Sequence, residues 1–366
     1  MAIFFKTLFD IITEPKETVY IFFWNYNTFG LPAIKEEMEC CSLKFYCHLD
    51  PTSLQEYIEK VFGTSYLVAN VTKMHGGAQK VVYKVDCTNG FSSVLYVWDL
   101  TMNYFQEEIA NNDVNAQSFG SDLFELNNKY LIEHSIRTPA LYDLNKERNR
   151  YTFDYALVEY VAGQSAEFYF KHSDSRVTDK VFEQLGELIT GMHANEREVY
   201  GKPDHNENNT RQCHLIQFEN AKRQLSYACE HINDIRTNQS KLLEMLYELE
   251  SRIEPRSCYG FIHGELGPNH VLVTDLLEPY LIDIEGAEFF DIEHEHSFLE
   301  FRFGDFYRYL KKDKLDLNRK LFYQYHHHLS LISAGLKLIH RGYPDQQTAR
   351  DISDYHTKCA LQFIEG

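Results

Sequence analysis

One stretch of the sequence, FIHGELGPNHVLV at residues 261–273, constrains the possible folds more than any other. It runs as an apolar strand into a His-Gly-acid triplet, breaks at Gly-Pro, and resumes as a second apolar strand. A little further on, YLIDIEGA at 280–287 sets a single acid, Asp283, among apolar residues. A buried acid is costly unless a cation or a hydrogen-bonding partner offsets its charge. These strand ends mark a candidate site, and a salt-bridged core aspartate is the alternative for Asp283.

The segment before this stretch, residues 65–100, has the pattern of three consecutive strands. VVYKVDC at 81–87 alternates apolar and polar residues, which is typical of a strand with one buried face. Asn-Gly at 89–90 predicts a tight hairpin turn, because these residues tolerate positive φ. The preceding turn, at 75–78, also contains glycines and joins the first two strands.

One helix and two further strands extend this small sheet. A helix is predicted at 121–135, where apolar residues recur at near-helical spacing, and we expect it to pack on the sheet. Strands at 136–144 and 154–163 then complete a five-stranded sheet with one inserted helix. An amphipathic helix at 54–63 precedes the first strand.

Beyond residue 163 the spacing of apolar residues becomes helical. Four long amphipathic segments predict helices over 181–193, 217–232, 239–253 and 319–340. The strand pair that carries the candidate site lies between the third and the fourth of these helices.

This order predicts an α+β chain with two lobes. Residues 1–50 form an extension of unassigned role, 51–160 a small β-rich lobe, and 161–366 a larger, mostly helical lobe with one β-hairpin. A crevice between two lobes is a common place for a ligand, so we expect the candidate site there.

The composition limits the classes of partner. The net charge is −18, from 54 acidic against 36 basic residues, which argues against nucleic acid or an anionic membrane surface as a partner. That charge is compatible with a cationic ligand. No run of about 18 apolar residues is present, so no membrane span is expected. The eight cysteines are scattered without a C-x-x-C pair, which is typical of free thiols in a reducing cytoplasm.

The order of elements, together with HGELGPNHVLV, YLIDIEGA and LGELITGMH at 185–193, resembles the aminoglycoside phosphotransferase and choline kinase family. The resemblance covers about residues 60 to 366. It implies a bilobal protein-kinase-like fold, with a five-stranded small lobe carrying one helix and a larger helical lobe. It also implies transfer of a phosphoryl group from ATP or GTP to a hydroxyl of a small molecule, such as an aminoglycoside, an aminoalcohol or a sugar-like compound.

The catalytic loop carries the next implication of the resemblance. Phosphoryl transfer depends on positioning and on neutralising charge, and the family loop pattern is H-x-D-x-x-x-x-N with a single Asp after the next strand. His263 matches the loop-stabilising His, and Glu265 stands at the catalytic acid–base position. His270 stands at one metal-ligand position, with Asn269 one place early, and Asp283 matches the main Mg²⁺ ligand. Glu285, two residues on, is a second candidate ligand or a structural acid.

The nucleotide side of the resemblance departs from the family in one respect. The Gly76-Gly77 turn would cover the phosphates, but Tyr96 stands where the third strand usually carries a Lys or Arg. Tyrosine can donate a hydrogen bond to a phosphate but cannot neutralise it. Lys80 or Lys84 on the neighbouring strand would compensate; the alternative for each is a solvated surface lysine.

Two further positions follow from the resemblance. Residues 158–161 match the hinge between the lobes, where backbone groups, here of Glu159 and Val161, would hold the purine base. Glu125 stands near the helix position whose acid normally pairs with the third-strand cation.

The departures at Tyr96, Glu265 and His270 all fall on catalytic or phosphate-contacting positions. They leave two readings of the function. The first is a small-molecule kinase that uses Mg²⁺ and ATP or GTP. The alternative is a pseudokinase that binds a nucleotide or a small ligand without turnover and serves as a regulatory module.

Two polar clusters fall outside these motifs. The acids and histidines at 291–296 either line a site for the hydroxylated acceptor, with a cationic acceptor as one option, or begin a helix. Consecutive residues on a helix point in different directions, so His326-His327-His328 is not expected to chelate one ion, and we expect surface or wedge residues.

Overall fold

The computed structural model describes residues 47–74, 77–111, 118–209 and 211–365. The chain divides into two compact units. The sheet unit comprises 41–217 and 252–324, and the helical unit includes 218–251 and 325–366. Two of the unit boundaries fall within long helices, α6 (Cys213–His231) and α11 (Leu317–His340). Within the described ranges, no helix is long and apolar enough to cross a membrane.

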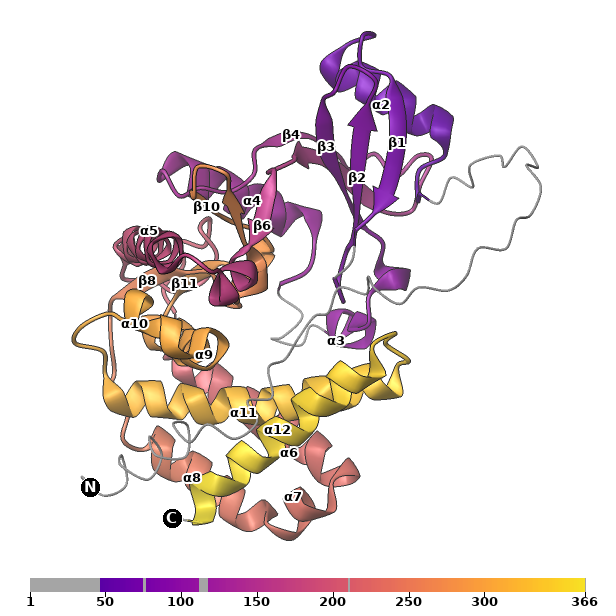
Figure 1. The fold of residues 1–366 in the computed structure, drawn as a ribbon. Coiled ribbons are helices and arrows are strands. Elements are labelled where there is room, and N and C mark those ends of the chain that lie inside the picture. The colour runs from indigo at the N-terminus through magenta and orange to yellow at the C-terminus, as the bar shows by residue number, and fades with distance from the viewer. Residues whose placement is uncertain (1–46, 75–76, 112–117, 210, 366) are drawn as a thin grey trace. The chain divides into compact units, whose positions relative to one another are not determined.

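The sheet unit contains the predicted five-stranded antiparallel sheet, in the order β1-β2-β3-β5-β4 (Figure 1). Its strands are β1 (Val68–Lys73), β2 (Val81–Cys87), β3 (Ser92–Trp98), β4 (Leu141–Asn145) and β5 (Asp154–Glu159). The inserted helix α4 (Ser121–Glu133) lies between β3 and β4 in the chain, after the short elements η1 (Leu100–Met102) and α3 (Gln106–Ala110). The expectation of a five-stranded sheet with one main inserted helix is confirmed.

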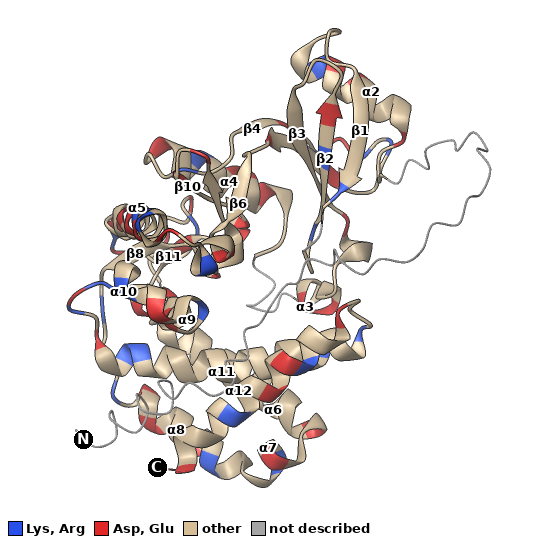
Figure 2. Cartoon of the chain, in the orientation of Figure 1, with Lys and Arg blue, Asp and Glu red and all other residues tan. Residues whose placement is uncertain are grey.

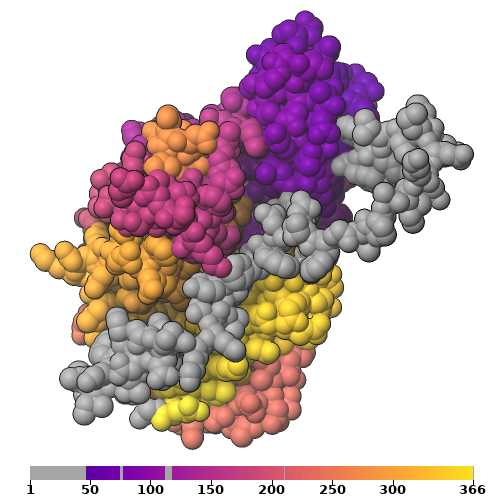
Figure 3. Space-filling model, in the orientation of Figure 1, coloured from indigo at the N-terminus to yellow at the C-terminus, as the bar shows by residue number. Residues whose placement is uncertain are grey.

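The apolar face of this sheet packs against α2 (Pro51–Phe62). Strand β2 alternates between buried and half-buried residues, as the period of two predicts. From α2, Leu54 and Ile58 are fully buried in the shared core. The carboxylate of Asp50 caps α2 by accepting a hydrogen bond from the Ser53 amide at 3.0 Å. The indigo spheres of the space-filling view show the outer surface of this part of the chain (Figure 3).

The rest of the sheet unit holds two small sheets where the sequence predicted a single β-hairpin. One has the order β10-β9-β6 and the other β11-β8-β7. Their strands are β6 (Gly163–Ser165), β7 (Glu196–Arg197), β8 (Tyr259–Ile262), β9 (Val271–Thr274), β10 (Pro279–Leu281) and β11 (Glu288–Phe290). The hairpin β9–β10 is present, but the expectation of one hairpin was wrong, because strands of two or three residues carry no readable period.

Helices pack around these small sheets. They are η3 (Ala166–Lys171), α5 (Ser175–His193), the start of α6 (Cys213–His231), η4 (Pro268–His270), η5 (Ile284–Gly286), α9 (Ile292–Phe303), η6 (Gly304–Phe306), α10 (Tyr307–Leu310) and the start of α11 (Leu317–His340). The predicted apolar stripe of α5 is buried. Gly186 lets α10 approach α5, because a Cβ at that position would lie 2.2 Å from the carbonyl oxygen of Tyr309.

The helical unit consists of the later parts of α6 and α11 with α7 (Asn233–Thr237), α8 (Gln239–Glu250) and α12 (Gln346–Glu365). Leu242 and Leu246 of α8 are fully buried, and the hydroxyl of Tyr325 donates to the Leu242 carbonyl at 2.8 Å. Gly335 permits close packing of α11 on α12, since a Cβ there would lie 2.7 Å from the Ala349 carbonyl oxygen. Acidic and basic residues are interspersed along α12 (Figure 2).

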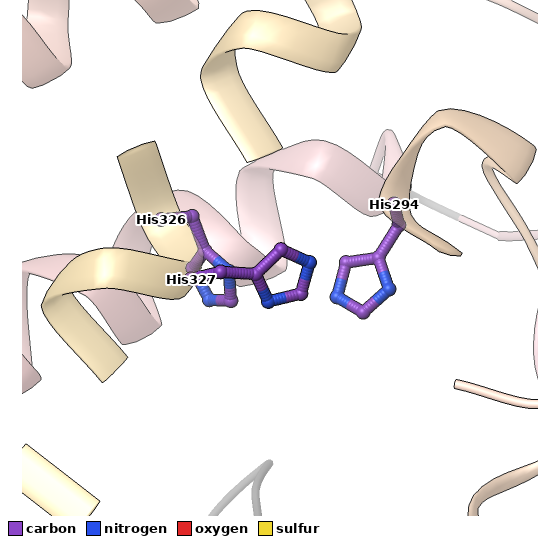
Figure 4. A group of neighbouring side chains, drawn as sticks. All are labelled: His294, His326 and His327. Atoms are coloured by element: carbon purple, nitrogen blue, oxygen red, sulfur yellow. The ribbon is translucent and has the colours of Figure 1, made fainter. Parts of the chain in front are cut away.

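The histidine run on α11 is largely buried. His326 and His327 are 3% and 6% exposed, and their ring centroids lie 5.2 Å apart (Figure 4). The expectation of surface residues was therefore wrong for these two; they act as wedges in the core. His294, also drawn in Figure 4, belongs to α9 of the sheet unit, where its ring lies 5.0 Å from that of Tyr323.

Candidate active site

The candidate site begins where β8 ends, at His263 and Gly264. Gly264 has φ +90°, and a Cβ there would lie 3.1 Å from the Gly286 carbonyl oxygen. Only glycine adopts this conformation readily, so the residue lets the chain turn close to the loop that follows β10. This turn brings the loop after β8 against the loop that carries Asp283.

Glu295 of α9 stabilises this turn through hydrogen bonds. Its fully buried carboxylate accepts hydrogen bonds from the backbone amides of His263 and Gly264, at 2.8 and 3.1 Å, and from His193 Nε2 of α5. The His263 ring donates from Nε2 to the carbonyl of Ile282 at 2.9 Å. His263 is therefore a structural residue of the loop, as the resemblance implied. The sequence did not reveal the part of Glu295, because its two partners on this loop are backbone groups.

Glu265 projects from this loop and its side chain is exposed. Partial desolvation raises the pKa of its carboxyl group, and the negative charges of Asp283 and Glu285 raise it further. A carboxylate with a raised pKa is a better proton acceptor than an ordinary glutamate. The backbone carbonyl oxygen of Glu265 accepts a hydrogen bond from His270 Nδ1 at 2.7 Å. This hydrogen bond connects the two ends of the loop.

Asp283 follows β10 in a left-handed backbone conformation, with φ +60°. A non-glycine residue in this conformation is strained, and such residues are frequent at functional sites. Burial opposes ionisation of Asp283, but the positive charge of Lys80 outweighs it and holds the pKa of this carboxyl well below its usual range. Its second oxygen lies 3.4 Å from His270 Nε2. Burial lowers the pKa of His270 to about 4, so this imidazole is neutral at neutral pH.

Lys80 supplies the cation of the site. It precedes β2, is 7% exposed, and its Nζ pairs with Asp283 and, at 2.6 Å, with Glu285 Oε1. Burial alone would lower its pKa, but the charges of Asp283 and Glu285 raise it above the ordinary value, so the ammonium form persists. Nζ also lies 5.0 Å from the ring centroid of Tyr96.

Two alternatives from the sequence are excluded by these contacts. Lys84 pairs with Asp86 at 2.8 Å and lies over the ring of Tyr160, so it does not take part in the site. Glu125 pairs at 2.6 Å with Lys146 on an exposed surface. The expected pairing of Glu125 with the nucleotide-side cation was wrong, because this acid lies on the outer face of α4.

The inner face of α4 carries Asn127, which donates to the carbonyl oxygens of Ile284 at 2.8 Å and Glu285 at 3.2 Å. Helix α4 thus supports the Asp283 loop by amide–backbone hydrogen bonds. Glu285, at 4% exposed, also accepts a hydrogen bond from Trp98 Nε1 at 3.2 Å. Strand β10 ends at Leu281, and Glu285 faces Lys80 from η5.

The remaining nucleotide-side residues lie around β5 and the turn before β2. Gly77 has φ +85°, as a glycine turn requires, whereas Gly76 lies outside the described residues. The amide and carboxylate of Glu159 are both hydrogen-bonded to Ala140, and Val161 is 7% exposed. The side chain of Glu159 is therefore structural, which fits a hinge where only backbone groups contact a base.

The acids at the start of α9 are buried and paired. Asp291 Oδ2 accepts hydrogen bonds from Arg319 and from the Tyr323 hydroxyl, both at 2.6 Å. Glu293 accepts two hydrogen bonds from Arg256, at 2.6 and 3.0 Å. Glu293 is 1% exposed and Asp291 is fully buried, so these acids support the fold and do not line a site for an acceptor.

Mg²⁺ is implied by the fold family, and the donor set can be tested against its chemistry. Asp283 and Glu285 offer carboxylate oxygens, which Mg²⁺ prefers, and both already face one cation. His270 offers an unprotonated Nε2, a donor that suits Mg²⁺ less well than oxygen. The amide oxygen of Asn269 accepts a hydrogen bond from Arg302 instead. The two acids fit the ion, and His270 is the weaker ligand of the set.

Known proteins resemble this chain in sequence over one segment and in fold over most of its length. Residues 128–295 match the model of the phosphotransferase enzyme family. No curated protein matches the sequence. A thermostable mutant of the aminoglycoside phosphotransferase APH(4)-Ia, in a ternary complex with ADP and hygromycin B, is 15% identical with a TM-score of 0.57, covering 84% of this chain and 98% of that one.

Two further solved structures are similar. The spectinomycin phosphotransferase APH(9)-Ia, in complex with ADP and spectinomycin, is 13% identical, with a TM-score of 0.57 and coverage of 87% of this chain and 99% of that one. Choline kinase LicA from Streptococcus pneumoniae is 15% identical, with a TM-score of 0.56 and coverage of 85% and 98%. The family match and these folds confirm the resemblance and the protein-kinase-like fold.

Proposed function

We propose that this chain, which matches the phosphotransferase enzyme family over residues 128–295, transfers a phosphoryl group from ATP or GTP to a hydroxyl of a small molecule. One observation carries the proposal: Lys80, Asp283 and Glu285 bring a cation and two acids together beside Glu265. Charge neutralisation next to a positioned proton acceptor is what phosphoryl transfer requires.

Each residue has a distinct role in this mechanism. Glu265 orients the acceptor hydroxyl and takes its proton as the new oxygen–phosphorus bond forms and the nucleoside diphosphate leaves. Its raised pKa improves this proton transfer. Asp283 and Glu285, with His270, would hold Mg²⁺, which neutralises phosphate charge when bound. The Gly76-Gly77 turn would cover the phosphates.

The acceptor is proposed at the level of a class. The similar structures include complexes with hygromycin B and spectinomycin and a choline kinase, and hygromycin B, spectinomycin and choline are all small hydroxylated molecules. The net charge of −18 favours a neutral or cationic acceptor over an anionic one. The backbone of Glu159 and Val161 would hold the purine base. The six described cysteines are free, which supports a cytoplasmic location.

The Asp283→Asn variant tests the proposed metal and nucleotide site. It should abolish Mg²⁺-dependent nucleotide binding while the chain stays folded, because the amide keeps an oxygen but loses the charge that offsets Mg²⁺. Thermal shift and calorimetry with ATP or GTP, each with and without Mg²⁺, measure this. Asp122→Asn, an exposed acid of α4, is the matched control. Unchanged Mg-nucleotide affinity in Asp283→Asn would refute the metal assignment.

A second candidate function, a pseudokinase that binds without turnover, is favoured by Glu265 and His270 standing where the family has Asp and Asn. Glu for Asp moves the carboxylate by roughly 1.5 Å, and a misplacement of about 1 Å can lower a rate about a hundredfold. In an active kinase, Glu265→Ala should leave nucleotide binding intact and lower turnover by about 10²–10⁴.

The paired change Glu265→Asp with His270→Asn separates the two functions. In a kinase adapted to its own residues this double variant should be slower than the wild type, because the site fits the longer acid. In a pseudokinase it should create phosphate transfer where the wild type shows none. The assay is transfer of γ-phosphate to a panel of aminoglycosides, aminoalcohols and sugars, with nucleotide hydrolysis as the second readout.

A further inference from the structure

A lysine at the start of β2 and a tyrosine of β3 lie side by side near Asp283. Antiparallel pairing sets Val82 opposite Tyr96 and Val81 opposite Val97. The position on β3 from which the resemblance expects a cation carries Tyr96, which is 7% exposed. The cation comes instead from Lys80, the residue that enters β2 next to this pair.

The surroundings of Lys80 fix its ammonium group in one place. Tyr96 presents its ring 5.0 Å from Nζ, within the range of a cation–π contact. Trp98, two residues further along β3, donates from Nε1 to Glu285, the same acid that pairs with Lys80. Two aromatic side chains of β3 thus position the lysine and its acidic partner, although neither carries a charge.

The glycine turn is packed directly on the backbone of this lysine. A Cβ at Gly77 would lie 2.5 Å from the carbonyl oxygen of Lys80, a separation that real Cβ atoms do not show. The turn that would cover the phosphates and the lysine therefore form one tightly connected segment of backbone. A cation at this point lies beside both the turn and the acid Asp283.

We propose that Lys80 is the cation that binds the nucleotide phosphates, delivered from the start of β2 with the ring of Tyr96 as its platform. In this arrangement Glu285 of η5 takes the part that a helix acid plays elsewhere, since Glu125 pairs with Lys146 on the outer surface. An ammonium group serves phosphates as a compact point charge and needs no particular orientation of its donors. A shift of its Cα between neighbouring strands is therefore compatible with its role. The inference rests on the proposed function and deepens it.

The test compares ligands with and without phosphates by calorimetry on the full chain. Lys80→Met should weaken ATP binding at least about tenfold and leave adenosine binding unchanged, because the lost contact is to phosphate alone. Lys84→Met, which removes a lysine four residues further along the chain, on β2, is the matched control and should bind ATP like the wild type. Guanosine nucleotides replace adenosine ones if the wild type prefers them.

The decisive variant returns the cation to β3. Lys80→Met combined with Tyr96→Lys should recover most of the lost ATP affinity, whereas Tyr96→Phe alone should change it less than about threefold, because the ring remains. Circular dichroism shows whether each variant is folded. If Lys80→Met fails that check, the same comparison is made on a Glu285→Gln background, where one acid fewer is left unpaired.

The outcomes separate this inference from the proposed function. Wild-type binding of ATP that Lys80→Met leaves undiminished overturns the assignment of Lys80 and keeps the function. Equal losses of ATP and adenosine affinity in a folded Lys80→Met also overturn it, since the lysine would then be structural. A wild type that binds neither ATP nor GTP, with or without Mg²⁺, overturns the proposed function and the inference together.

Discussion

Two groups of acids lie within about a dozen residues of each other in the chain and differ in their burial and in their partners. Glu285 on η5 and Asp283, which directly precedes η5, face one lysine, and Asp283 keeps 41% of its side chain exposed. Asp291, Glu293 and Glu295 at the start of α9 are 0–1% exposed. The sequence presents both groups as acids beside apolar residues, and only the contacts distinguish them.

The difference lies in how the carboxylate oxygens are satisfied. The α9 acids are each held by two or more donors, which include two arginines and the backbone amides of the loop after β8. Buried acids that are held by several donors inside the protein support its fold. Asp283 and Glu285 are instead bridged by one lysine, and the side chain of Asp283 stays open to solvent. The acids of the candidate site are thus distinguished by a shared cation and by access to Asp283.

The largest expected effect is a loss of folding stability when one of the buried acids at the start of α9 is removed. Glu295→Ala should lower the free energy of unfolding by about 3 kcal/mol or more, because three donors lose their acceptor at a cost of about 1–3 kcal/mol each. Asp283→Asn should change it by less than about 1 kcal/mol, because Lys80 keeps its contact with Glu285. Denaturant unfolding followed by circular dichroism measures both variants. Equal losses in the two would remove the distinction between the groups.

A smaller effect is expected on how folding stability depends on pH, through a buried histidine beside these acids. His296, beside these acids, is fully buried, and burial lowers its pKa to about 2, with the charge of His193 acting in the same direction. Below the unfolded-state pKa of about 6.5, the unfolded chain takes up a proton that the folded chain refuses, so stability falls as the pH falls. In His296→Gln the loss between pH 7 and pH 5 should be about 2 kcal/mol smaller than in the wild type.

The control for this measurement is His134→Gln, an exposed histidine at the end of α4. It should keep the acid sensitivity of the wild type. The two unfolding series are run at pH 7 and pH 5 in the same buffer. An unchanged pH dependence in His296→Gln would show that this histidine is protonated in the folded protein.

The smallest effect is expected at the surface. Glu125→Gln removes one of two acids that contact Lys146, on side chains that are 41–50% exposed. Solvent-exposed pairs contribute about 0–1 kcal/mol, so the melting temperature should move by no more than about 2 °C and nucleotide binding should be unchanged. A measurable loss of ATP affinity in Glu125→Gln would mean that Glu125 does support the site, as the resemblance implied.

The fold was predictable where a periodic signal is long enough. The alternation in β2 and the apolar stripe of α5 are local patterns, and both elements appear as expected. The two small sheets were not foreseen in full, because β6 and β7 have three and two residues and acquire their strand geometry from their neighbours.

The site was predictable where it depends on spacing along the chain. The loop pattern singled out Glu265 and Asp283 as candidates, and the close approach of Gly264 to Gly286 brings the loops that carry them together. The choice between Lys80 and Lys84 could not be made, because both lie on the same strand region and only the packing of Tyr96 and Tyr160 decides which one turns inward. The role of Glu295 was equally hidden, since its partners on the loop are amides that every sequence has.

The amide of Asn127 has a consequence for control of the site. In protein kinases the cation is anchored by an acid on the helix, so that a shift of the helix switches the pair on and off. Here the anchoring acid, Glu285, is two residues from Asp283 in the same turn, while the hydrogen bonds from Asn127 of α4 go to the backbone of that turn. A displacement of α4 would leave Lys80 and Glu285 together. The enzyme we propose would be assembled whenever it is folded, and its output would follow the supply of its substrates.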